Sequence, residues 1–478
     1  MTSTWKVDVV VLGAGTAGLT ARRAAEKAGA STLLVDPGPL GTTCARVGCM
    51  PSKLLIAAAD AAHAAGQAEL FGLRAHVTVD GRRVMARVKR ERDRFVGDVL
   101  RSIEALREKG LFLQGTGRFA GPDTIRVDEH TEVQARAVVV ATGSKSVIPA
   151  PYCGLGDALM TNEQIFEMDD LPESLLVLGT GIIGLELGQA LARLGVRVTL
   201  IGKLHDIGPL SDPVMKEEAL RIFSGELDLH TEHELYGVRR EGDGVEIRFT
   251  DSAGRERKER YRKVLAAAGM RPNLGGLQLE RAGIVPDDRG IPPFDPHTMQ
   301  IGDRPVFLAG DVNGMRPFLH EAAAQGKIAG ENAARYPDVL TQPRSVALSI
   351  VFTDPQMAAV GRPWSELRCG EDRIGEVDFS SQGRSRVMAA DRGRARIYGA
   401  YDSGLIEGVE MLGPRVEHLA HLIAWSMEKK MSVSEALSMP FYHPVVEEGL
   451  RTALRDLEAS LRIAHRAGAE CDEFGPGG

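Results

Sequence analysis

Residues 7–36 read VDVVVLGAGTAGLTARRAAEKAGASTLLVD, and residues 175–202 repeat the same design as LLVLGTGIIGLELGQALARLGVRVTLIG. Each stretch is an apolar run, a Gly-x-Gly-x-x-Gly turn, a helix-forming segment rich in alanine and leucine, and a second apolar run. This order is the strand–turn–helix–strand unit of a dinucleotide-binding fold. The sequence therefore predicts an α/β protein with two Rossmann-like units.

In such a unit each of the three glycines has its own task. The first makes the tight turn, the second lets the backbone approach a pyrophosphate, and the third lets the helix pack closely on the strand. The helix N-terminus then faces the phosphates. One turn is a weak signal, but two turns between a strand and a helix indicate two dinucleotides, or two halves of an electron-transfer path. The glycines concerned are Gly13, Gly15 and Gly18, then Gly179, Gly181 and Gly184.

The residue that closes each second strand bears on which nucleotide is bound. Asp36 ends the first unit about 20 residues past the glycines, where a carboxylate can bind the hydroxyl pair of a ribose. Gly202 takes this place in the second unit and is followed by Lys203 and His205. The missing carboxylate removes the usual repulsion of a 2′-phosphate, and Lys203 could attract one, although a loop lysine is more often solvated. The choice between NAD and NADP stays open.

Bulk composition narrows the class of protein. The chain has 478 residues, 43% of them hydrophobic and 26% charged, so about three domains are expected. A net charge of −7 argues against a nucleic-acid or general membrane-surface binder. No apolar run reaches the ~20 residues that span a bilayer, and the N-terminus lacks signal-peptide features. A cytoplasmic protein is expected.

Two of the five cysteines, Cys44 and Cys49, have only four residues between them. Five cysteines in a chain of this length form no disulfide framework, and a reducing compartment would open an ordinary disulfide. A zinc site needs four ligands, and no second Cys or His pair follows at suitable spacing, so no metal is expected. The pair is interpreted as redox-active. The other thiols are expected to be buried or incidental: Cys153, Cys369 and Cys471.

Three later apolar runs, residues 137–149, 264–273 and 305–314, end in glycine-containing turns. Such strands are typical of a parallel sheet whose carboxyl ends hold a ligand. Asp311 closes the last of them, where it could meet a polar ligand or cap the next turn. Residues 346–478 mix strands and helices without a nucleotide motif, and they predict a separate packing or assembly domain.

Residues 41–53, GTTCARVGCMPSK, resemble the redox motif of the flavin-dependent pyridine nucleotide–disulfide oxidoreductases, and most of all their dihydrolipoyl dehydrogenase branch. That motif is Gly-Gly-x-Cys-x-x-x-Gly-Cys-x-Pro-Ser-Lys, and the chain departs from it only at Thr42. The resemblance covers nearly the whole length. It includes both glycine turns, residues 141–143, GMRPN at 269–273, AGD at 309–311 and HPVVEE at 443–448.

The resemblance implies a fold of two Rossmann-like domains, for FAD and NAD(P), plus a C-terminal α+β dimerisation domain. The implied boundaries are residues 1–150 for the FAD-binding domain and 151–272 for the NAD(P)-binding domain. Residues 273–345 would form a central domain that completes the FAD site, and residues 346–478 the dimerisation domain. The implied cofactors are FAD and NAD, with NADP as the open alternative.

By the same resemblance, the first glycine turn and Asp36 would hold the ADP half of FAD; most relatives carry glutamate at this position. Lys53 would lie near the flavin and pair with Glu186, and Asp311 would bind the ribityl chain. The second turn would cradle the pyridine nucleotide, and NAD-preferring relatives carry an acidic residue in place of Gly202. Further cofactor contacts are implied at Thr142, Gly143 and Gly269.

Cys49 would be the thiol nearest the flavin, and Cys44 the thiol that exchanges with substrate. A helix N-terminus beside the pair favours the thiolate, lowering a pKa that is ordinarily about 8.5. Residues 441–450, FYHPVVEEGL, supply His443 and Glu448. In the family this pair is a dyad in which the histidine is the base and the carboxylate orients it. There it reaches the other subunit's site, so a homodimer is expected.

The implied reaction oxidises dihydrolipoamide to lipoamide through a Cys44–Cys49 disulfide and passes the electrons through FAD to NAD⁺. The lipoyl group would arrive on a separate protein, because no lipoyl domain precedes the first glycine turn. NADPH-dependent disulfide or mercuric reductases of the same family remain alternatives. So does a non-catalytic flavoprotein redox sensor, although such a module has no use for both cysteines and the dyad.

Overall fold

The first Rossmann-like unit forms a seven-stranded sheet in the computed structural model, which describes residues 3–203, 205–368 and 371–461. Strands β3 (Phe112–Gln114), β2 (Thr32–Asp36), β1 (Ser3–Leu12) and β6 (Thr131–Val140) lie side by side and parallel. Beyond β6 come the antiparallel β5 (Thr124–Arg126) and β4 (Arg118–Phe119). Val9 to Val11 of β1 are fully buried, as a strand covered on both faces requires.

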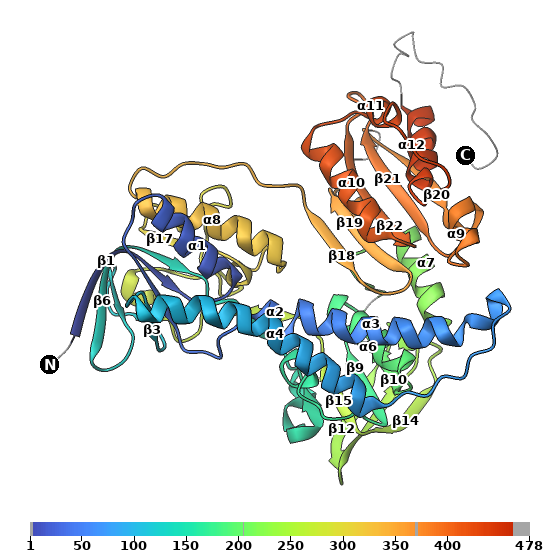
Figure 1. The fold of residues 1–478 in the computed structure, drawn as a ribbon, viewed down its shortest axis with the longest axis horizontal. Coiled ribbons are helices and arrows are strands. Elements are labelled where there is room, and N and C mark those ends of the chain that lie inside the picture. Colours follow the sequence, from blue (N-terminus) through green and yellow to red (C-terminus); the bar gives the residue numbers. More distant parts are fainter. Residues whose placement is uncertain (1–2, 204, 369–370, 462–478) are drawn as a thin grey trace.

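A late segment of the chain completes this first lobe. Strand β17 (Val306–Leu308) pairs in parallel with β6, and helix α8 (Leu319–Arg335) packs along α1 (Thr16–Lys27) (Figure 1). Gly326 and Gly330 permit the close approach, because an added Cβ would meet the Cα atoms of Ala17 and Ala21 at 3.1 and 2.8 Å. Residues of the expected central segment 273–345 therefore join the first sheet, and the domain boundaries themselves stay predictions.

The second unit forms a five-stranded parallel sheet in the order β11, β10, β9, β15, β8. These strands are Asp228–His230, Arg197–Ile201, Ser174–Leu178, Lys263–Ala266 and Leu159–Met160. Helix α6 (Ile182–Arg193) follows the second glycine turn, and α7 (Pro213–Ser224) precedes β11. A separate antiparallel sheet of β12 (Leu235–Glu241), β13 (Gly244–Thr250) and β14 (Glu256–Tyr261) lies at the outer edge of this lobe (Figure 1).

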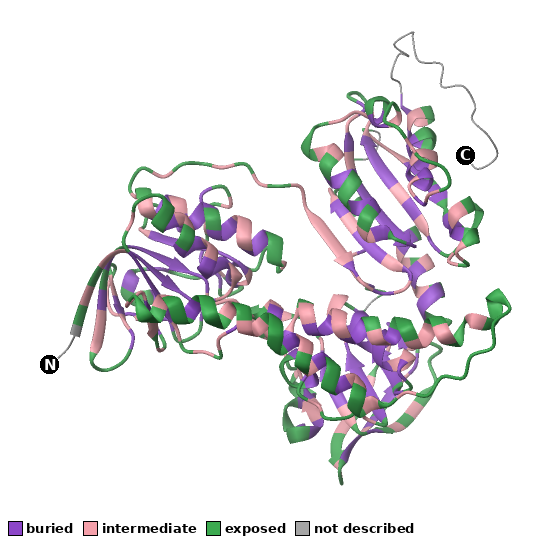
Figure 2. Cartoon of the chain, in the orientation of Figure 1, coloured by how far each residue is buried: buried purple, intermediate pink, exposed green. Residues whose placement is uncertain are grey.

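The third lobe is a five-stranded antiparallel sheet in the order β18, β19, β22, β21, β20. Its strands are Leu348–Val351, Gln356–Gly361, Ile406–Gly413, Arg394–Ala400 and Asp372–Asp378, and they are covered by α10 (Val416–Glu428) and α12 (Glu448–Ser460). The strands at the centre of each lobe are largely buried, while the outward helix faces and the strands β12 and β14 are largely exposed (Figure 2). None of the helices in the described ranges combines the length and apolarity needed to cross a bilayer.

Buried polar contacts join the second lobe to the third. The Glu410 carboxylate, fully buried on β22, accepts hydrogen bonds from the backbone amides of Ser211 and Asp212 at 2.9 and 3.0 Å. Asp212 is equally buried and accepts from Arg396 at 2.6 Å and Tyr398 at 3.0 Å. Because buried carboxylates without partners are costly, the hydrogen bonds to Glu410 and Asp212 help to hold the two lobes together.

Candidate active site

The first glycine turn has the local geometry that the sequence predicts. Gly13 takes a φ of +110°, and an added Cβ would collide with the Ala141 carbonyl. A Cβ at Gly18 would collide with the carbonyl oxygen of Gly13, so glycine is required for the helix to pack here. A Cβ at Gly15 would meet nothing within 4 Å. Open space therefore lies in front of Gly15, the N-cap of α1, where a phosphate would approach the amide groups.

The second turn repeats this geometry. Gly179 takes a φ of +116° against the Ala267 carbonyl, and a Cβ at Gly184 would collide with the Gly179 oxygen. The middle glycine, Gly181, again faces open space and is the N-cap of α6, with φ −76° and ψ −174°. Gly15 has φ −77° and ψ −176°. The two turns are thus near-copies, each offering a helix N-terminus to an anion.

The two cysteines lie on consecutive helices. Cys44 belongs to α2 (Thr43–Val47), and Cys49 is the first residue of α3 (Cys49–Gly66), directly after its N-cap Gly48. Both are free thiols, so the structure represents the dithiol form. Thr42, the departure from the family motif, caps α2 by accepting a hydrogen bond from the Ala45 amide at 3.2 Å. It does so at φ 60° and ψ 147°, where a β-branched residue is strained.

A hydrogen bond between the thiols shifts their pKa values in opposite directions. The bond to Cys44 lowers the pKa of Cys49 to about 7, against burial, and the Lys53 ammonium adds to the effect. The same bond, together with burial, raises the pKa of Cys44 well above its ordinary value. Cys49 is therefore the thiol that ionises first, and Cys44 is the thiol that donates to it.

Lys53 lies one helical turn beyond Cys49 on α3 and pairs with Glu186 of α6. Its Nζ donates to both carboxylate oxygens at 2.9 and 2.8 Å, which is the pairing that the sequence resemblance implied. Glu186 is only 4% exposed and also accepts from the Phe352 amide at 2.9 Å. The Lys53 Nζ lies 4.5 Å from the centre of the Phe352 ring. This cluster joins α3 and α6 to the third lobe beside the thiols.

A cavity of about 1120 Å³ connects the two glycine turns. It is lined by many of the residues singled out from the sequence, namely Gly15, Cys44, Cys49, Lys53, Gly143, Gly179, Gly181, Glu186, Gly269 and Asp311. Gly13, Gly18 and Gly184 do not line the cavity but set the backbone conformation of the two turns. The cavity therefore places the thiol pair between two anion-binding helix termini.

The remaining predicted cofactor residues support the walls of this cavity. Asp36 accepts hydrogen bonds from the amides of Ala14 and Gly38, both at 2.6 Å, and so holds the first turn closed. Thr142 donates from Oγ1 to the Asn273 carbonyl at 2.7 Å, and Asn273 donates back to the Thr142 carbonyl at 3.2 Å. The sequence did not indicate that reciprocal contact, although Asn273 closes the GMRPN motif.

Asp311 faces the cavity with a single side-chain partner among the described residues, the Ser144 hydroxyl at 3.2 Å. Burial raises its pKa above the ordinary value, as expected for a carboxylate that lacks a polar ligand. Together with the open Gly15 and the N-terminus of α1, this donor and acceptor set fits a bound FAD. Here FAD would supply two-electron and hydride chemistry.

The expected dyad is formed, and it lies apart from the thiols of its own chain. The Nδ1 atom of His443 is 3.1 Å from both oxygens of Glu448, the first residue of α12. Glu448 is buried and also accepts from the Val445 amide at 3.2 Å. The His443 side chain is 65% exposed. Within the described residues, neither member of the dyad lines the cavity that holds Cys44.

The scattered thiols and a metal site were also considered from the sequence. Cys153 is exposed, so it is not a core residue, while Cys369 and Cys471 lie outside the described residues. Within the described ranges, no group of three or more His, Cys, Asp or Glu side chains is placed to hold a metal ion. Cys44 and Cys49 both line the cavity.

The chain belongs to the pyridine nucleotide-disulphide oxidoreductase family: residues 7–326 match its family model, and residues 348–454 match the model of its dimerisation domain. This membership confirms the predicted fold class and makes the chain a flavoprotein oxidoreductase similar to dihydrolipoyl dehydrogenase. The third lobe is therefore the dimerisation domain.

The sequence is 31% identical to dihydrolipoyl dehydrogenase from Haloferax volcanii, over 93% of this chain and 95% of the relative. It is also 31% identical to the Thermus scotoductus enzyme of the same name, over 96% and 99%. Among solved structures, LpdA from Mycobacterium tuberculosis has a TM-score of 0.80 at 25% identity, covering 94% of this chain and 99% of that one. The HOCl-induced flavoprotein disulfide reductase RclA from Escherichia coli has the same fold, with a TM-score of 0.80 at 20% identity, over 96% of this chain and 100% of that one.

Proposed function

We propose that the chain oxidises dihydrolipoamide to lipoamide and passes the electrons, through FAD, to a nicotinamide dinucleotide. The observation that carries the proposal is the hydrogen-bonded pair of Cys44 and Cys49 in the cavity between the two glycine turns. The pair has one thiol of lowered pKa and one of raised pKa, as suits dithiol–disulfide exchange. The dihydrolipoyl dehydrogenases among its relatives support the choice of dithiol.

In the exchange half-reaction, the oxidised Cys44–Cys49 pair accepts two electrons from the dithiol. A substrate thiolate attacks the Cys44 sulfur, breaks the Cys44–Cys49 bond and releases the Cys49 thiolate. The second substrate sulfur then attacks the mixed disulfide, which closes the lipoamide ring and frees Cys44. Of the two protons lost by the substrate, one ends on Cys44 and the other must leave through a base.

His443 is our choice for that base. Glu448 contacts Nδ1, so it fixes the ring orientation, stabilises the imidazolium and leaves Nε2 free to take the proton. Because the dyad lies away from the thiols of its own chain, we assign the proton transfer to the partner subunit's His443 in a homodimer. The dimerisation domain supports such an assembly.

Other residues hold the reduced pair ready for oxidation. The Lys53 ammonium stabilises the Cys49 thiolate and is itself fixed by the buried Glu186. The helix N-terminus at Cys49 favours the same charge. A carrier protein that presents the lipoyl group and a cytoplasmic location complete the proposal, since a reducing compartment keeps a cycling dithiol from being locked as a disulfide.

The experiment measures initial rates of nicotinamide reduction by the FAD-loaded protein with dihydrolipoamide, with NAD⁺ and NADP⁺ tested side by side. We expect turnover with at least one acceptor, loss of turnover in Cys44→Ser and in Cys49→Ser, and wild-type rates in Cys153→Ser. Cys153 is the matched control because its exposed thiol does not line the cavity. Absence of turnover from FAD-loaded protein would refute the lipoamide assignment. It would favour a reductase that passes electrons from NADPH to another disulfide.

A further inference from the structure

The end of strand β10 differs from a site that recognises an unmodified ribose. Such a site carries a carboxylate at the end of the second strand, where it binds the ribose hydroxyls. Here that place is Gly202, and an added Cβ would collide with the Thr180 hydroxyl and lie 2.7 Å from its Cγ2 atom. The Thr180 side chain therefore occupies the space that an acidic side chain at position 202 would need.

Thr180 is held in this place by its own hydrogen bond. Its hydroxyl donates to the Asp206 carbonyl at 2.5 Å, which ties the turn between Gly179 and Gly181 to the loop after β10. The Gly202 amide donates to the His230 carbonyl at 2.7 Å, so the strand end is fixed as well. The packed Thr180 side chain thus excludes a carboxylate at position 202. Replacing Gly202 alone would not make room for one.

Two of the side chains that line the cavity beside this wall, Lys203 and His233, could contact an anion. Lys203 lines the cavity, and its ammonium has no hydrogen-bond or ion-pair partner within the described part of the chain. His233 lines it too, and its Nδ1 atom is buried without a hydrogen-bond partner. An anion placed against Gly202 could be met by both groups.

The nearby carboxylates have partners other than Lys203. Asp206 pairs with Lys216 at 3.0 Å, and Glu232 pairs with His205 at 2.5 Å. Among the described contacts, neither of these acids is paired with Lys203. The local balance favours a phosphate over a ribose hydroxyl, because the phosphate gains a charge-assisted contact and meets no unpaired carboxylate.

We propose that the second dinucleotide site selects a 2′-phosphorylated adenosine, so that the nicotinamide nucleotide of this chain is NADP(H) and not the expected NAD(H). Lys203 binds the 2′-phosphate, His233 donates a second contact from a ring N–H, and Thr180 excludes the carboxylate that would repel it. The inference rests on the proposed function only in taking the second glycine turn as the nicotinamide nucleotide site.

The test is calorimetric titration of FAD-loaded protein with adenosine 2′,5′-bisphosphate and with 5′-AMP, two probes that differ only in the 2′-phosphate. Bound FAD keeps the first turn from competing for either probe. We expect the bisphosphate to bind at least about tenfold more tightly. Equal or weaker binding of the bisphosphate would overturn the proposal.

Three variants sharpen the result. Lys203→Ala should reduce the preference several-fold, while Lys258→Ala, which removes an equal charge at a site outside the cavity, should leave it unchanged. The double variant Thr180→Gly/Gly202→Glu should reverse the preference toward 5′-AMP. If the ratio of the two affinities were unchanged in Lys203→Ala, Lys203 would not be a ligand of the 2′-phosphate. The titrations contain no dithiol, so these binding ratios do not depend on whether dihydrolipoamide is the substrate. Likewise, a failure of the NADP(H) proposal would leave the lipoamide assignment standing.

Discussion

The difference in pKa between the two thiols depends on the hydrogen bond that joins them. Because Cys44 donates to Cys49, ultraviolet absorbance of thiolate in the reduced protein should titrate with an apparent midpoint near pH 7. In Cys44→Ala, which cannot donate, the midpoint of the Cys49 titration should rise by about one pH unit or more. In Cys44→Ser the midpoint should stay low only if the serine hydroxyl donates to Cys49 as the thiol does. An unchanged midpoint in Cys44→Ala would contradict this account.

Lys53 and Glu186 form a pair of which the carboxylate is almost completely buried. Removing the ammonium in Lys53→Met leaves that carboxylate with only the Phe352 amide, so unfolding free energy should fall by about 2–4 kcal/mol. Glu186→Gln keeps a hydrogen-bonding group and should cost less. The double variant should recover part of the loss, and a thermal-unfolding cycle of the four proteins measures the coupling. Strictly additive losses would refute a direct interaction.

Sequence analysis located the chemistry at this scale but not all of its support. The contacts of Lys53 with Glu186 and of His443 with Glu448 could be anticipated, because the motifs that carry them are specific. The amide of Phe352 on Glu186 could not, since a backbone donor leaves no signature in the sequence. Nor could Gly202 reveal that Thr180, 22 positions earlier, fills the space beside it.

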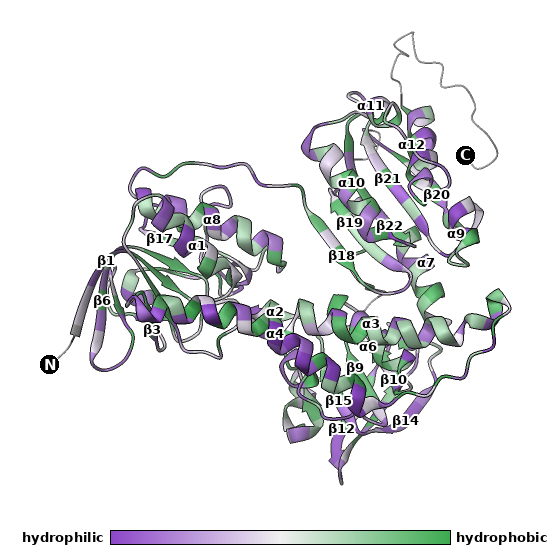
Figure 3. Cartoon of the chain, viewed as in Figure 1, coloured by the Kyte–Doolittle hydropathy of each residue, from purple (hydrophilic) through white to green (hydrophobic). Residues whose placement is uncertain are grey.

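Secondary-structure elements were predictable where local sequence controls them. Both glycine turns have the expected geometry, because positive φ angles and helix contact each demand glycine at a fixed spacing. The outer sheet of β12, β13 and β14 was not anticipated. Its strands carry many charged side chains, and β12 and β14 are largely hydrophilic in Figure 3. Such strands lack the apolar alternation by which a sheet is recognised.

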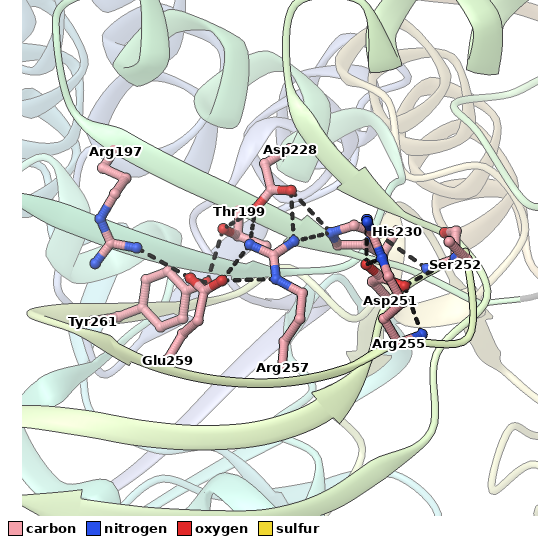
Figure 4. Close-up of polar contacts among 11 residues, drawn as sticks. Arg197, Thr199, Asp228, His230, Asp251, Ser252, Arg255, Arg257, Glu259 and Tyr261 are labelled. Carbon is pink, nitrogen blue, oxygen red and sulfur yellow. Dashed lines mark hydrogen bonds and ion pairs between the residues drawn. The ribbon is translucent and has the colours of Figure 1, made fainter.

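A polar cluster attaches this outer sheet to the parallel one (Figure 4). Arg257 of β14 donates to Asp228 of β11 at 2.8 and 3.0 Å and contacts Glu259 on its own strand. Burial raises the pKa of Asp228, but hydrogen bonds from His230, Arg257 and Thr199 outweigh it and bring the pKa below its ordinary value. The charged form of Asp228 therefore stabilises the fold.

We expect Arg257→Ala to lower the unfolding free energy by about 1 kcal/mol at pH 7, a modest value because the pair is partly exposed. The native pKa of Asp228 is depressed, so its contribution is complete above the unfolded value of about 4 and is lost as pH falls through the native value. Urea unfolding of both proteins at pH 7 and pH 3 measures this. The gap between them should narrow at pH 3, and a widening gap would contradict it.

His443, the proposed base, lies at the surface of the molecule, whereas the two thiols line the cavity. His443 is 65% exposed, and its neighbour in the sequence, Tyr442, is 80% exposed; Trp425 on α10 of the same domain is 65% exposed. Exposed aromatic residues of this kind mark interaction surfaces. A second copy seated there would cover them and bring its cavity to the histidine.

Mixing two inactive variants tests this arrangement directly. Cys44→Ser lacks the exchanging thiol and His443→Gln lacks the base, so each homodimer should be inactive or nearly so. After the two proteins are dissociated, mixed in equal amounts and reassociated, half of the dimers should be hybrids, each with one complete site. Activity should then recover to about a quarter of the wild-type value. If thiol and base belonged to the same chain, neither site of a hybrid would be complete and no activity would return; size-exclusion chromatography of the mixture confirms that hybrids had the chance to form.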